Sequence, residues 1–397
     1  MILSIVIPAL NEEDSIASII ERTLTASPII IKNTDITEVE ITVVSDGSTD
    51  NTVKFAQKYL PKINLIIFEK NKGYGAAIKQ GWNESKGDLV AFLDADGTCD
   101  PLFFENLCNL LKTENADVVL GCRLNKESKM PLIRRVGNFM FAALLTFLSS
   151  SKVKDTASGM RVVKRASLNK LYPLPDGLHF TPAMSAKALM NDNVTIAEID
   201  MPYNERDGES KLHVLKDGIR FLRVILTAAF LYRPQVIFNS VASILFIFSA
   251  LLMFQPLGYY FANHKVAEWM IYRFIVSETF AITAMVLFSS SFVLHNTVWL
   301  SLSNDIEKEK VSGLVMSFFK SKFSTLLALG LLIVGLVLIG SSIGSRIITG
   351  HTHEHWSRYI AFSFLTISGF IILITKWINW VFSVLKDKVL YIQANSH

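Results

Sequence analysis

The stretch Leu89-Val-Ala-Phe-Leu-Asp94-Ala-Asp96-Gly97-Thr98 runs from an apolar segment into two acids that are separated by one residue. The apolar segment is typical of a buried strand, and in a strand alternate side chains point to the same face. Asp94 and Asp96 therefore point the same way at the carboxyl end of this strand, where two carboxylates repel unless a cation lies between them. Mg2+ or Mn2+ suits such a pair when substrate phosphates complete its ligands. The alternative is an ordinary Asp-Gly turn at a solvated strand end, with Gly97 permitting the turn.

Three earlier apolar runs are predicted to be strands that end in polar turns, at residues 3–7, 40–44 and 64–68. Helical patterns separate these strands, and such an alternation favours a mostly parallel sheet with right-handed crossovers. In open sheets of this kind ligands bind beyond the carboxyl ends of the strands. We therefore expect a Rossmann-like α/β domain with one crevice, lined by residues 8–12, Asp46, Lys72, Asp94 and Asp96.

The chain changes character near residue 235. Half of the 397 residues are hydrophobic, and the apolar excess is concentrated in four runs, at about 236–254, 274–294, 323–344 and 359–380. Each run approaches or exceeds the length that crosses a bilayer. Buried core helices are the alternative, but the short polar gaps leave such helices too little polar surface. We expect an α-helical membrane domain over 235–397 with four transmembrane helices.

Charges around these runs predict their orientation. Lysines are concentrated between the second and third runs and in the C-terminal tail, whereas the other two gaps hold fewer basic residues. The positive-inside rule then places both termini in the cytoplasm. The apolar residues 1–8 are too short for a signal peptide, which agrees with this placement. The net charge of +4 suits a membrane surface and not nucleic acid, and the three cysteines lack metal-ligand spacing.

Two further segments are predicted to be amphipathic helices in the membrane surface. Residues 131–148 are apolar with Arg134 near their start, too polar to span a bilayer and too apolar to be free in water. A core helix of the globular domain is the alternative for this segment. Residues 213–234 carry a second amphipathic, basic pattern and lead into the first apolar run. The expected organisation is a globular domain at 1–212, a juxtamembrane helix at 213–234 and the membrane domain.

Several motifs together resemble those of the family 2 glycosyltransferases, which have the GT-A fold. They are Ile5-Val-Ile-Pro-Ala-Leu-Asn-Glu-Glu13, Val43-Val-Ser-Asp-Gly-Ser-Thr-Asp50, Asn71-Lys-Gly-Tyr-Gly-Ala-Ala77 and Asp94-Ala-Asp96. Two later motifs, Asp155…Ser158-Gly-Met-Arg161 and Arg206-x-x-Gly-x-Ser-Lys211, narrow the resemblance to polyprenyl-phosphate glycosyltransferases of the dolichyl-phosphate mannose or glucose synthase type. The motifs cover about residues 1–235, and the hydropathy of the remainder matches the version with two interfacial helices and four C-terminal spans.

This resemblance implies a metal-dependent, inverting hexosyltransferase. It would move a sugar from a nucleotide-sugar to polyprenyl (dolichyl or undecaprenyl) phosphate at the cytoplasmic membrane face, with Mg2+ or Mn2+ held by Asp94 and Asp96. The residues implied for the nucleotide are Pro8, Leu10, Glu12, Val44, Asp46, Lys72 and Asp94. The residues implied for the lipid phosphate are Arg123, Arg134, Arg206, Ser210 and Lys211. The candidate catalytic residues are Asp96, Asp155, Arg206 and Lys211.

Two of these assignments stay open. Asp155 either orients a sugar hydroxyl or the nucleophile, or it caps the turn that follows it. Some relatives have a glutamine after the two acids that completes the metal ligands, whereas this chain has Gly97-Thr98-Cys99, so Thr98 or water is the substitute. The chemistry itself requires no strong base, because a lipid phosphate is already ionised at neutral pH. It requires cations that bring two anions together, and arginine fits phosphate best.

Two other functions are alternatives. A processive polysaccharide synthase would carry a Gln-x-x-Arg-Trp motif before its channel helices, and this chain has no such motif. A non-catalytic membrane scaffold or lipid carrier is disfavoured by the acidic and basic residues of the motifs. UDP-glucose is the favoured donor, with GDP-mannose next. The four spans would gather subunits into a homo-oligomer or help to present the lipid.

Overall fold

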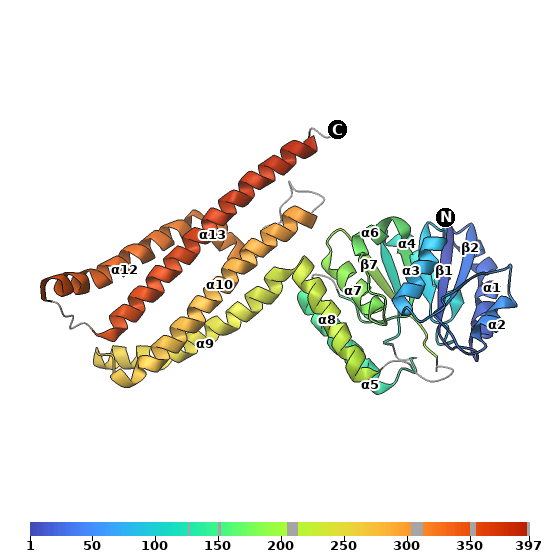
Figure 1. The fold of residues 1–397 in the computed structure, drawn as a ribbon, viewed down its shortest axis with the longest axis horizontal. Helices are drawn as coiled ribbons and strands as arrows, with labels where there is room; N and C mark the ends of the chain where they lie inside the picture. Colours follow the sequence, from blue (N-terminus) through green and yellow to red (C-terminus); the bar gives the residue numbers. More distant parts are fainter. Residues whose placement is uncertain (126–127, 150–151, 205–212, 303–312, 350–354, 395–397) are drawn as a thin grey trace. The chain divides into compact units, whose positions relative to one another are not determined.

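The computed structural model describes residues 1–125, 128–149, 152–204, 213–302, 313–349 and 355–394. The chain divides into two compact units, Met1–Tyr232 and Arg233–His397 (Figure 1). The first unit is α/β and the second is helical. The segment 213–234 that the sequence sets apart as a juxtamembrane helix thus falls almost entirely in the first unit.

The first unit is built on a sheet that has seven strands among the described residues, in the order β3-β2-β1-β4-β6-β5-β7. The strands are β1 (Ile2–Ala9), β2 (Glu38–Ser45), β3 (Asn64–Ile67), β4 (Leu89–Leu93), β5 (Val118–Cys122), β6 (Met160–Lys164) and β7 (Ile196–Asp200). Strands β1 to β4 are parallel to one another, and β5 is parallel to β7. Among these described strands only β6 reverses direction, and it pairs antiparallel with both β4 and β5. The prediction of a mostly parallel sheet is confirmed.

Helices cover both faces of this sheet (Figure 1). The helices of the first unit are α1 (Ile16–Asn33), α2 (Thr52–Gln57), α3 (Tyr74–Glu84), α4 (Phe104–Thr113), α5 (Leu132–Leu148), α6 (Leu168–Leu171), α7 (Phe180–Met190) and α8 (Val214–Tyr232). On one face of the sheet, Ile5 of β1 and Ile19 of α1 belong to the same hydrophobic core. Phe92 of β4 packs on the other face with Trp82 of α3 and Phe180 of α7, at ring-centroid distances of 6.1 and 5.9 Å. The alternation of side chains along each strand therefore supplies two cores, as expected for a sheet between helical layers.

The second unit consists of apolar helices. They are α9 (Pro234–Asn263), α10 (Ile271–Leu302), α11 (Leu314–Lys320), α12 (Lys322–Thr349) and α13 (Trp356–Ala394). Within the described residues, α9, α10, α12 and α13 are long and apolar enough to cross a membrane. Ser249 of α9 and Ser277 of α10 are hydrogen-bonded (2.9 Å), and Glu278 of α10 accepts a hydrogen bond from Ser363 of α13. Large apolar side chains point outward, as at Phe254, which is 80% exposed. These features mark the chain as a membrane protein.

Candidate active site

The carboxyl ends of β1, β2 and β4 border a cavity of about 410 Å3 in the first unit. Acidic residues of the cavity follow the strands, and its arginines come from the end of β5 and from α5 and α8. The residues that line it include Pro8, Leu10, Glu12, Asp46, Tyr74, Asp94, Asp96, Arg123, Arg134, Tyr203, Arg220 and Phe221. The cavity therefore combines carboxylates and guanidinium groups from segments more than 200 residues apart.

Asp94 and Asp96 follow β4 directly, and both line the cavity. The Tyr74 hydroxyl donates a hydrogen bond to Asp94 Oδ1 (2.6 Å). The Thr98 backbone N–H and hydroxyl both donate to Asp96 Oδ1 (3.2 and 2.7 Å). Gly97, with φ of +73°, makes the turn that brings Thr98 back to Asp96. Each carboxylate is therefore oriented by a neutral hydroxyl donor.

Asp94 also packs against the backbone of Gly159, which directly precedes β6. The Asp94 N–H donates to the Gly159 carbonyl oxygen (3.3 Å). A Cβ added at Gly159 would lie 1.7 Å from Asp94 Oδ2, far inside contact distance. The antiparallel pairing of β6 with β4 thus places Gly159 against the carboxylate, and the carboxylate has room there only because residue 159 has no side chain.

Tyr74, at the start of α3, is enclosed by aromatic rings. Its ring makes edge contacts with Phe92 and Phe180, at centroid distances of 6.3 and 6.4 Å. Burial, and then the charge of Asp94, raise the pKa of Tyr74 well above its ordinary value. The hydroxyl therefore stays protonated and remains a donor to Asp94. The Asn71-to-Ala77 motif contains Tyr74, but nothing in the sequence links this residue to Asp94.

The turn before α3 contributes through its backbone. Asp46 Oδ1 accepts a hydrogen bond from the Lys72 N–H (2.7 Å), and Asp46 Oδ2 accepts one from the Gly73 N–H (3.0 Å). Burial raises the pKa of Asp46, and the two backbone donors oppose that shift. The Lys72 ammonium lies over the Phe68 ring, 4.4 Å from its centroid, and Val44 is fully buried in the core beneath α3. Of the residues expected at the nucleotide, the cavity thus brings together Pro8, Leu10, Glu12, Asp46 and Asp94.

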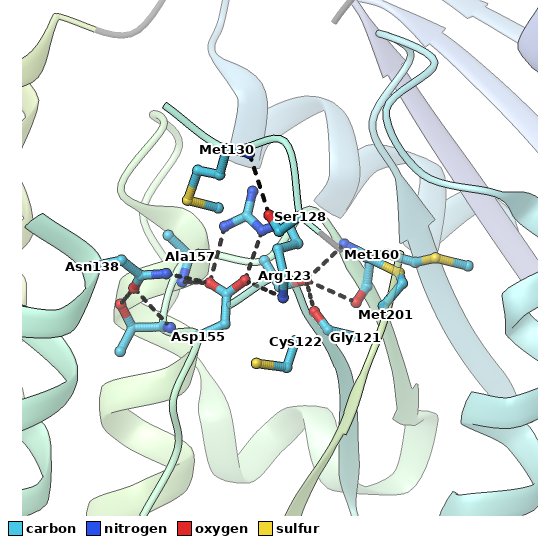
Figure 2. A network of polar contacts seen from close by, with 12 residues as sticks. Gly121, Cys122, Arg123, Ser128, Met130, Asn138, Asp155, Ala157, Met160 and Met201 are labelled. Carbon is cyan, nitrogen blue, oxygen red and sulfur yellow. Dashed lines mark hydrogen bonds and ion pairs between the residues drawn. The ribbon is translucent and has the colours of Figure 1, made fainter. Parts of the chain in front are cut away.

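A second polar cluster holds Arg123, which follows β5 (Figure 2). Asp155 is fully buried and accepts hydrogen bonds from Arg123 Nε (2.7 Å), Nη2 (3.0 Å) and backbone N–H (3.0 Å). Asn138 Nδ2 and the Ala157 N–H donate to the same carboxylate (2.7 and 3.1 Å). Burial acts to raise the pKa of Asp155, but the charge and hydrogen bonds of Arg123 outweigh it and lower the pKa to about 2. Asp155 therefore stays ionised, and it caps the turn at Ala157 while it binds Arg123.

Two amphipathic helices complete the cavity. α5 contributes Arg134 and α8 contributes Arg220, and the helices pack through Phe141 and Phe221, whose ring centroids are 5.9 Å apart. Arg220 Nη1 donates to Oδ1 of the buried Asp217 (3.0 Å). Both helices also expose large apolar side chains, among them Leu132, Ile133, Val136, Phe139, Met140, Phe147, Leu215, Ile219 and Phe230. Each helix thus presents arginine to the cavity and apolar groups to its surroundings.

Some expected residues cannot be placed, and some functional neighbours were not expected. Arg206, Ser210 and Lys211 lie in residues 205–212, outside the described residues. The residues that the sequence did not assign to the cavity or its supports include Tyr74, Asn138, Gly159, Tyr203 and Arg220. Arg220 was visible only as part of the basic pattern of its helix. An isolated tyrosine or asparagine gives no pattern at all, so only the fold could identify the others.

The acidic residues of the cavity fit a particular kind of metal site. Among the residues that the structure describes, no group of three or more His, Cys, Asp or Glu side chains could hold a metal ion. Asp94 and Asp96 instead supply two carboxylates to one open cavity. This donor set fits a hard divalent cation whose other ligands are phosphate oxygens and water. It does not fit a closed site made by protein ligands alone.

Comparison with known proteins agrees with this geometry. Residues 4–172 match the model of glycosyl transferase family 2. The chain is 33% identical over 242 residues to the low-salt glycan biosynthesis hexosyltransferase Agl6 of Haloferax volcanii, over 60% of this chain and 55% of that protein. It is 31% identical over 220 residues to the dolichyl-phosphate hexose transferase of the same organism, over 54% of this chain and 89% of that protein. It is 30% identical over 256 residues to the dolichyl-phosphate beta-glucosyltransferase of Saccharomyces cerevisiae, over 58% of this chain and 75% of that protein.

The fold and the cavity define a glycosyltransferase of the GT-A type. The chain belongs to glycosyl transferase family 2, and the resemblance inferred from its motifs is confirmed. The alignment spans just over half the length of the first of these relatives and larger shares of the other two.

Proposed function

We propose that this protein transfers a sugar from a nucleotide-sugar to polyprenyl phosphate, with inversion at the anomeric carbon. The observation that carries the proposal is a single cavity where Asp94 and Asp96 meet arginines from α5 and α8, two helices with exposed apolar side chains. The acids suit a metal-bound diphosphate, the arginines suit a phosphate, and the apolar side chains suit an acceptor that sits in a membrane. Relatives named for dolichyl-phosphate hexose and glucose transfer support the same assignment.

We assign the nucleotide to the part of the cavity beside Pro8, Leu10, Glu12 and Asp46. Asp94 and Asp96 would hold Mg2+ or Mn2+, with the donor diphosphate providing further ligands. A divalent cation there supplies Lewis-acid stabilisation of the charge that develops on the leaving diphosphate. Tyr74 and Thr98 support the site by fixing the orientation of the two carboxylates.

We assign the acceptor phosphate to the arginines Arg123, Arg134 and Arg220. A guanidinium group donates two parallel hydrogen bonds to a phosphate, which fixes its orientation as well as its charge. The exposed apolar side chains of α5 and α8 would lie in the cytoplasmic face of the membrane and bring the polyprenyl chain to the cavity. The family resemblance adds Arg206, Ser210 and Lys211 to this phosphate site.

The proposed reaction depends on alignment and charge, not on a base. An oxygen of the ionised lipid phosphate attacks the anomeric carbon on the face opposite the diphosphate. The bond from that carbon to the diphosphate breaks, and the nucleoside diphosphate leaves with the electron pair. Asp155 is unsuited to proton abstraction, because it is fully buried, its pKa is about 2, and Arg123 and Asn138 already occupy both of its oxygens. Holding the two reactants in line supplies much of the rate.

The proposal extends to the membrane unit. We place the globular unit and both termini in the cytoplasm, with α9, α10, α12 and α13 crossing the membrane. UDP-glucose is the favoured donor and GDP-mannose the second, and a relative named as a glucosyltransferase supports the order. We propose that the four helices either gather subunits into a homo-oligomer or help to present the lipid.

The test uses the full-length protein in detergent with polyprenyl phosphate, Mn2+ or Mg2+, and a panel of UDP- and GDP-sugars. We expect one donor to give lipid-dependent release of nucleoside diphosphate and a lipid carrying one sugar, with both lost on adding EDTA. Asp96→Asn should abolish the reaction in folded protein. Products with many sugars would indicate a processive synthase. Folded wild-type protein that gives no lipid product with any donor would contradict the proposal.

A further inference from the structure

Asn138 is a buried polar residue that attaches α5 to the interior of the globular unit. It is buried, with 7% of its surface exposed, although α5 exposes apolar side chains on both sides of it in sequence. Its Nδ2 donates to Asp155 Oδ1 (2.7 Å), and its Oδ1 accepts from the Thr156 N–H and hydroxyl (3.1 and 2.7 Å). Only this orientation of the amide satisfies both partners. The nitrogen and the oxygen of the Asn138 amide therefore both connect α5 to the segment of Asp155 and Thr156.

Asp155 passes this attachment on to Arg123. The same Oδ1 that accepts from Asn138 also accepts from Arg123 Nη2, and Oδ2 accepts from Arg123 Nε (3.0 and 2.7 Å) (Figure 2). The guanidinium group also lies over the Tyr203 ring, 5.4 Å from its centroid. One edge of the guanidinium is thereby fixed, while Arg123 still lines the cavity. A guanidinium held in this way is preorganised to bind a phosphate.

These contacts connect a helix with an exposed apolar face to an arginine of the cavity in two steps. α5 exposes Phe139 and Met140 immediately after Asn138, at 69% and 65% of their surface. A shift of α5 must move the Asn138 amide, which shares a carboxylate oxygen with Arg123 Nη2. The orientation of the guanidinium is thus coupled to the position of α5.

We infer that Asn138 and Asp155 are positioning residues for Arg123, and that through them the seating of α5 on the lipid surface sets the geometry of the acceptor phosphate. The inference rests on the proposed function for the identity of that phosphate. It assigns to Asp155 a role in orienting an arginine, and it gives Asn138 a role that no motif indicates. A purely structural role for Asn138 makes a different prediction, because its loss would then act independently of Arg123.

The experiment is a double-mutant cycle on the full-length protein, with Asn138→Ala, Arg123→Ala and the pair. Transfer from UDP-glucose to polyprenyl phosphate is measured as kcat and as KM for each substrate. We expect Asn138→Ala to lower kcat/KM for the lipid about 10- to 100-fold, as misplaced supporting groups do. The KM for UDP-glucose should stay within about twofold, because the nucleotide side of the cavity is untouched. In the Arg123→Ala background the same substitution should change kcat/KM by less than about twofold.

Two further variants keep the test decisive. Ile30→Ala removes a fully buried side chain of α1, a helix outside the network, so its effect should be the same with and without Arg123. Thr156→Val removes only the hydroxyl donor to Asn138 and should lower kcat/KM for the lipid about fivefold. This variant replaces Asn138→Ala in the cycle if Asn138→Ala does not fold. Equal effects of Asn138→Ala, or of Thr156→Val, in both Arg123 backgrounds would overturn the inference.

The melting temperature of each variant separates this inference from the proposed function. If wild-type protein transfers no sugar to polyprenyl phosphate with any donor, the proposed function is wrong. The same cycle on the melting temperature then still reports whether Asn138 and Arg123 are coupled in the folded protein. Additive shifts in melting temperature would overturn the inference in that case, and non-additive shifts would support it.

Discussion

The substitution Gly159→Ala tests the role of Asp94 without changing a polar group. The alanine Cβ would lie 1.7 Å from Asp94 Oδ2 and 2.4 Å from Asp94 Cγ. A non-bonded carbon–oxygen contact needs about 3.3 Å, so the carboxylate must retreat by roughly 1.5 Å, and its hydrogen bond from Tyr74 is lost with that movement. Because a displacement of about 1 Å at a reacting site can lower the reaction rate roughly 100-fold, we expect the rate of sugar transfer to fall by at least that factor. This loss corresponds to about 2.7 kcal/mol of transition-state stabilisation.

The assay is nucleoside diphosphate release with polyprenyl phosphate over a titration of Mn2+. We expect Gly159→Ala to need more metal for half-maximal activity as well as to lower kcat. Gly137→Ala is the matched control, because nothing lies within 4 Å of an added Cβ there and alanine favours the helix. That control should keep its activity. Wild-type kcat and metal dependence in Gly159→Ala would refute the reasoning, because Asp94 would then have no part in metal-dependent transfer.

Three further predictions concern single interactions. Tyr74→Phe removes the 2.6 Å hydrogen bond to Asp94 and should raise the half-saturating Mn2+ concentration about tenfold, as loss of a supporting contact to a metal ligand does; an unchanged titration would exclude this role. The pKa of Asp155 is about 2 against 3.8 for an ordinary aspartate, so its stabilisation is complete above about pH 4 and is lost as the pH falls toward 2. Asp155→Asn should therefore lower the free energy of unfolding by about 2 kcal/mol at pH 7, and its melting temperature should depend less on pH between pH 4 and 2. A melting temperature that falls with pH as steeply as that of the wild-type protein would contradict the assignment. Arg220→Gln should raise the KM for polyprenyl phosphate about fivefold and leave that for the donor unchanged; a rise in the donor KM alone would place Arg220 beside the nucleotide.

The sheet was predictable because its strands carry their own signals. Apolar runs that end in polar turns identified β1 to β4 and the edge where the acids lie. The limits of single strands were less predictable, as at Pro8, where the predicted strand 3–7 stops but β1 continues to Ala9. Pro8 is tolerated there because the pairing of β1 with β4 has already ended at Val6, while the pairing with β2 goes on. The end of a strand thus depends on its neighbours, which no local pattern reveals.

Most charged residues of the candidate site were predictable from the sequence, Arg220 excepted, whereas the residues that support them were not. Asp94 and Asp96 belong to a motif, the family resemblance implies Arg123, and the fold places all three in one cavity. The contact of Gly159 with Asp94 depends on the insertion of β6 between β4 and β5, and hydrophobic periodicity does not report strand order. Asn138 lies on an apolar helix where a lone amide has no recognisable pattern. These contacts are set by tertiary packing, which only the assembled sheet defines.

The place of β6 in the sheet also governs the order in which the protein can assemble during synthesis. β4 and β5 leave the ribosome first, yet they are joined only through β6, which is made later. A nascent chain that ends before residue 150 contains Asp94 and Asp96 but lacks β6 together with Gly159 and Asp155, which precede it. Such a chain has neither the backbone that confines Asp94 nor the carboxylate that holds Arg123. The confinement of Asp94 and the hold on Arg123 therefore both arise only after residues 155–164 have been made, late in the synthesis of the globular unit.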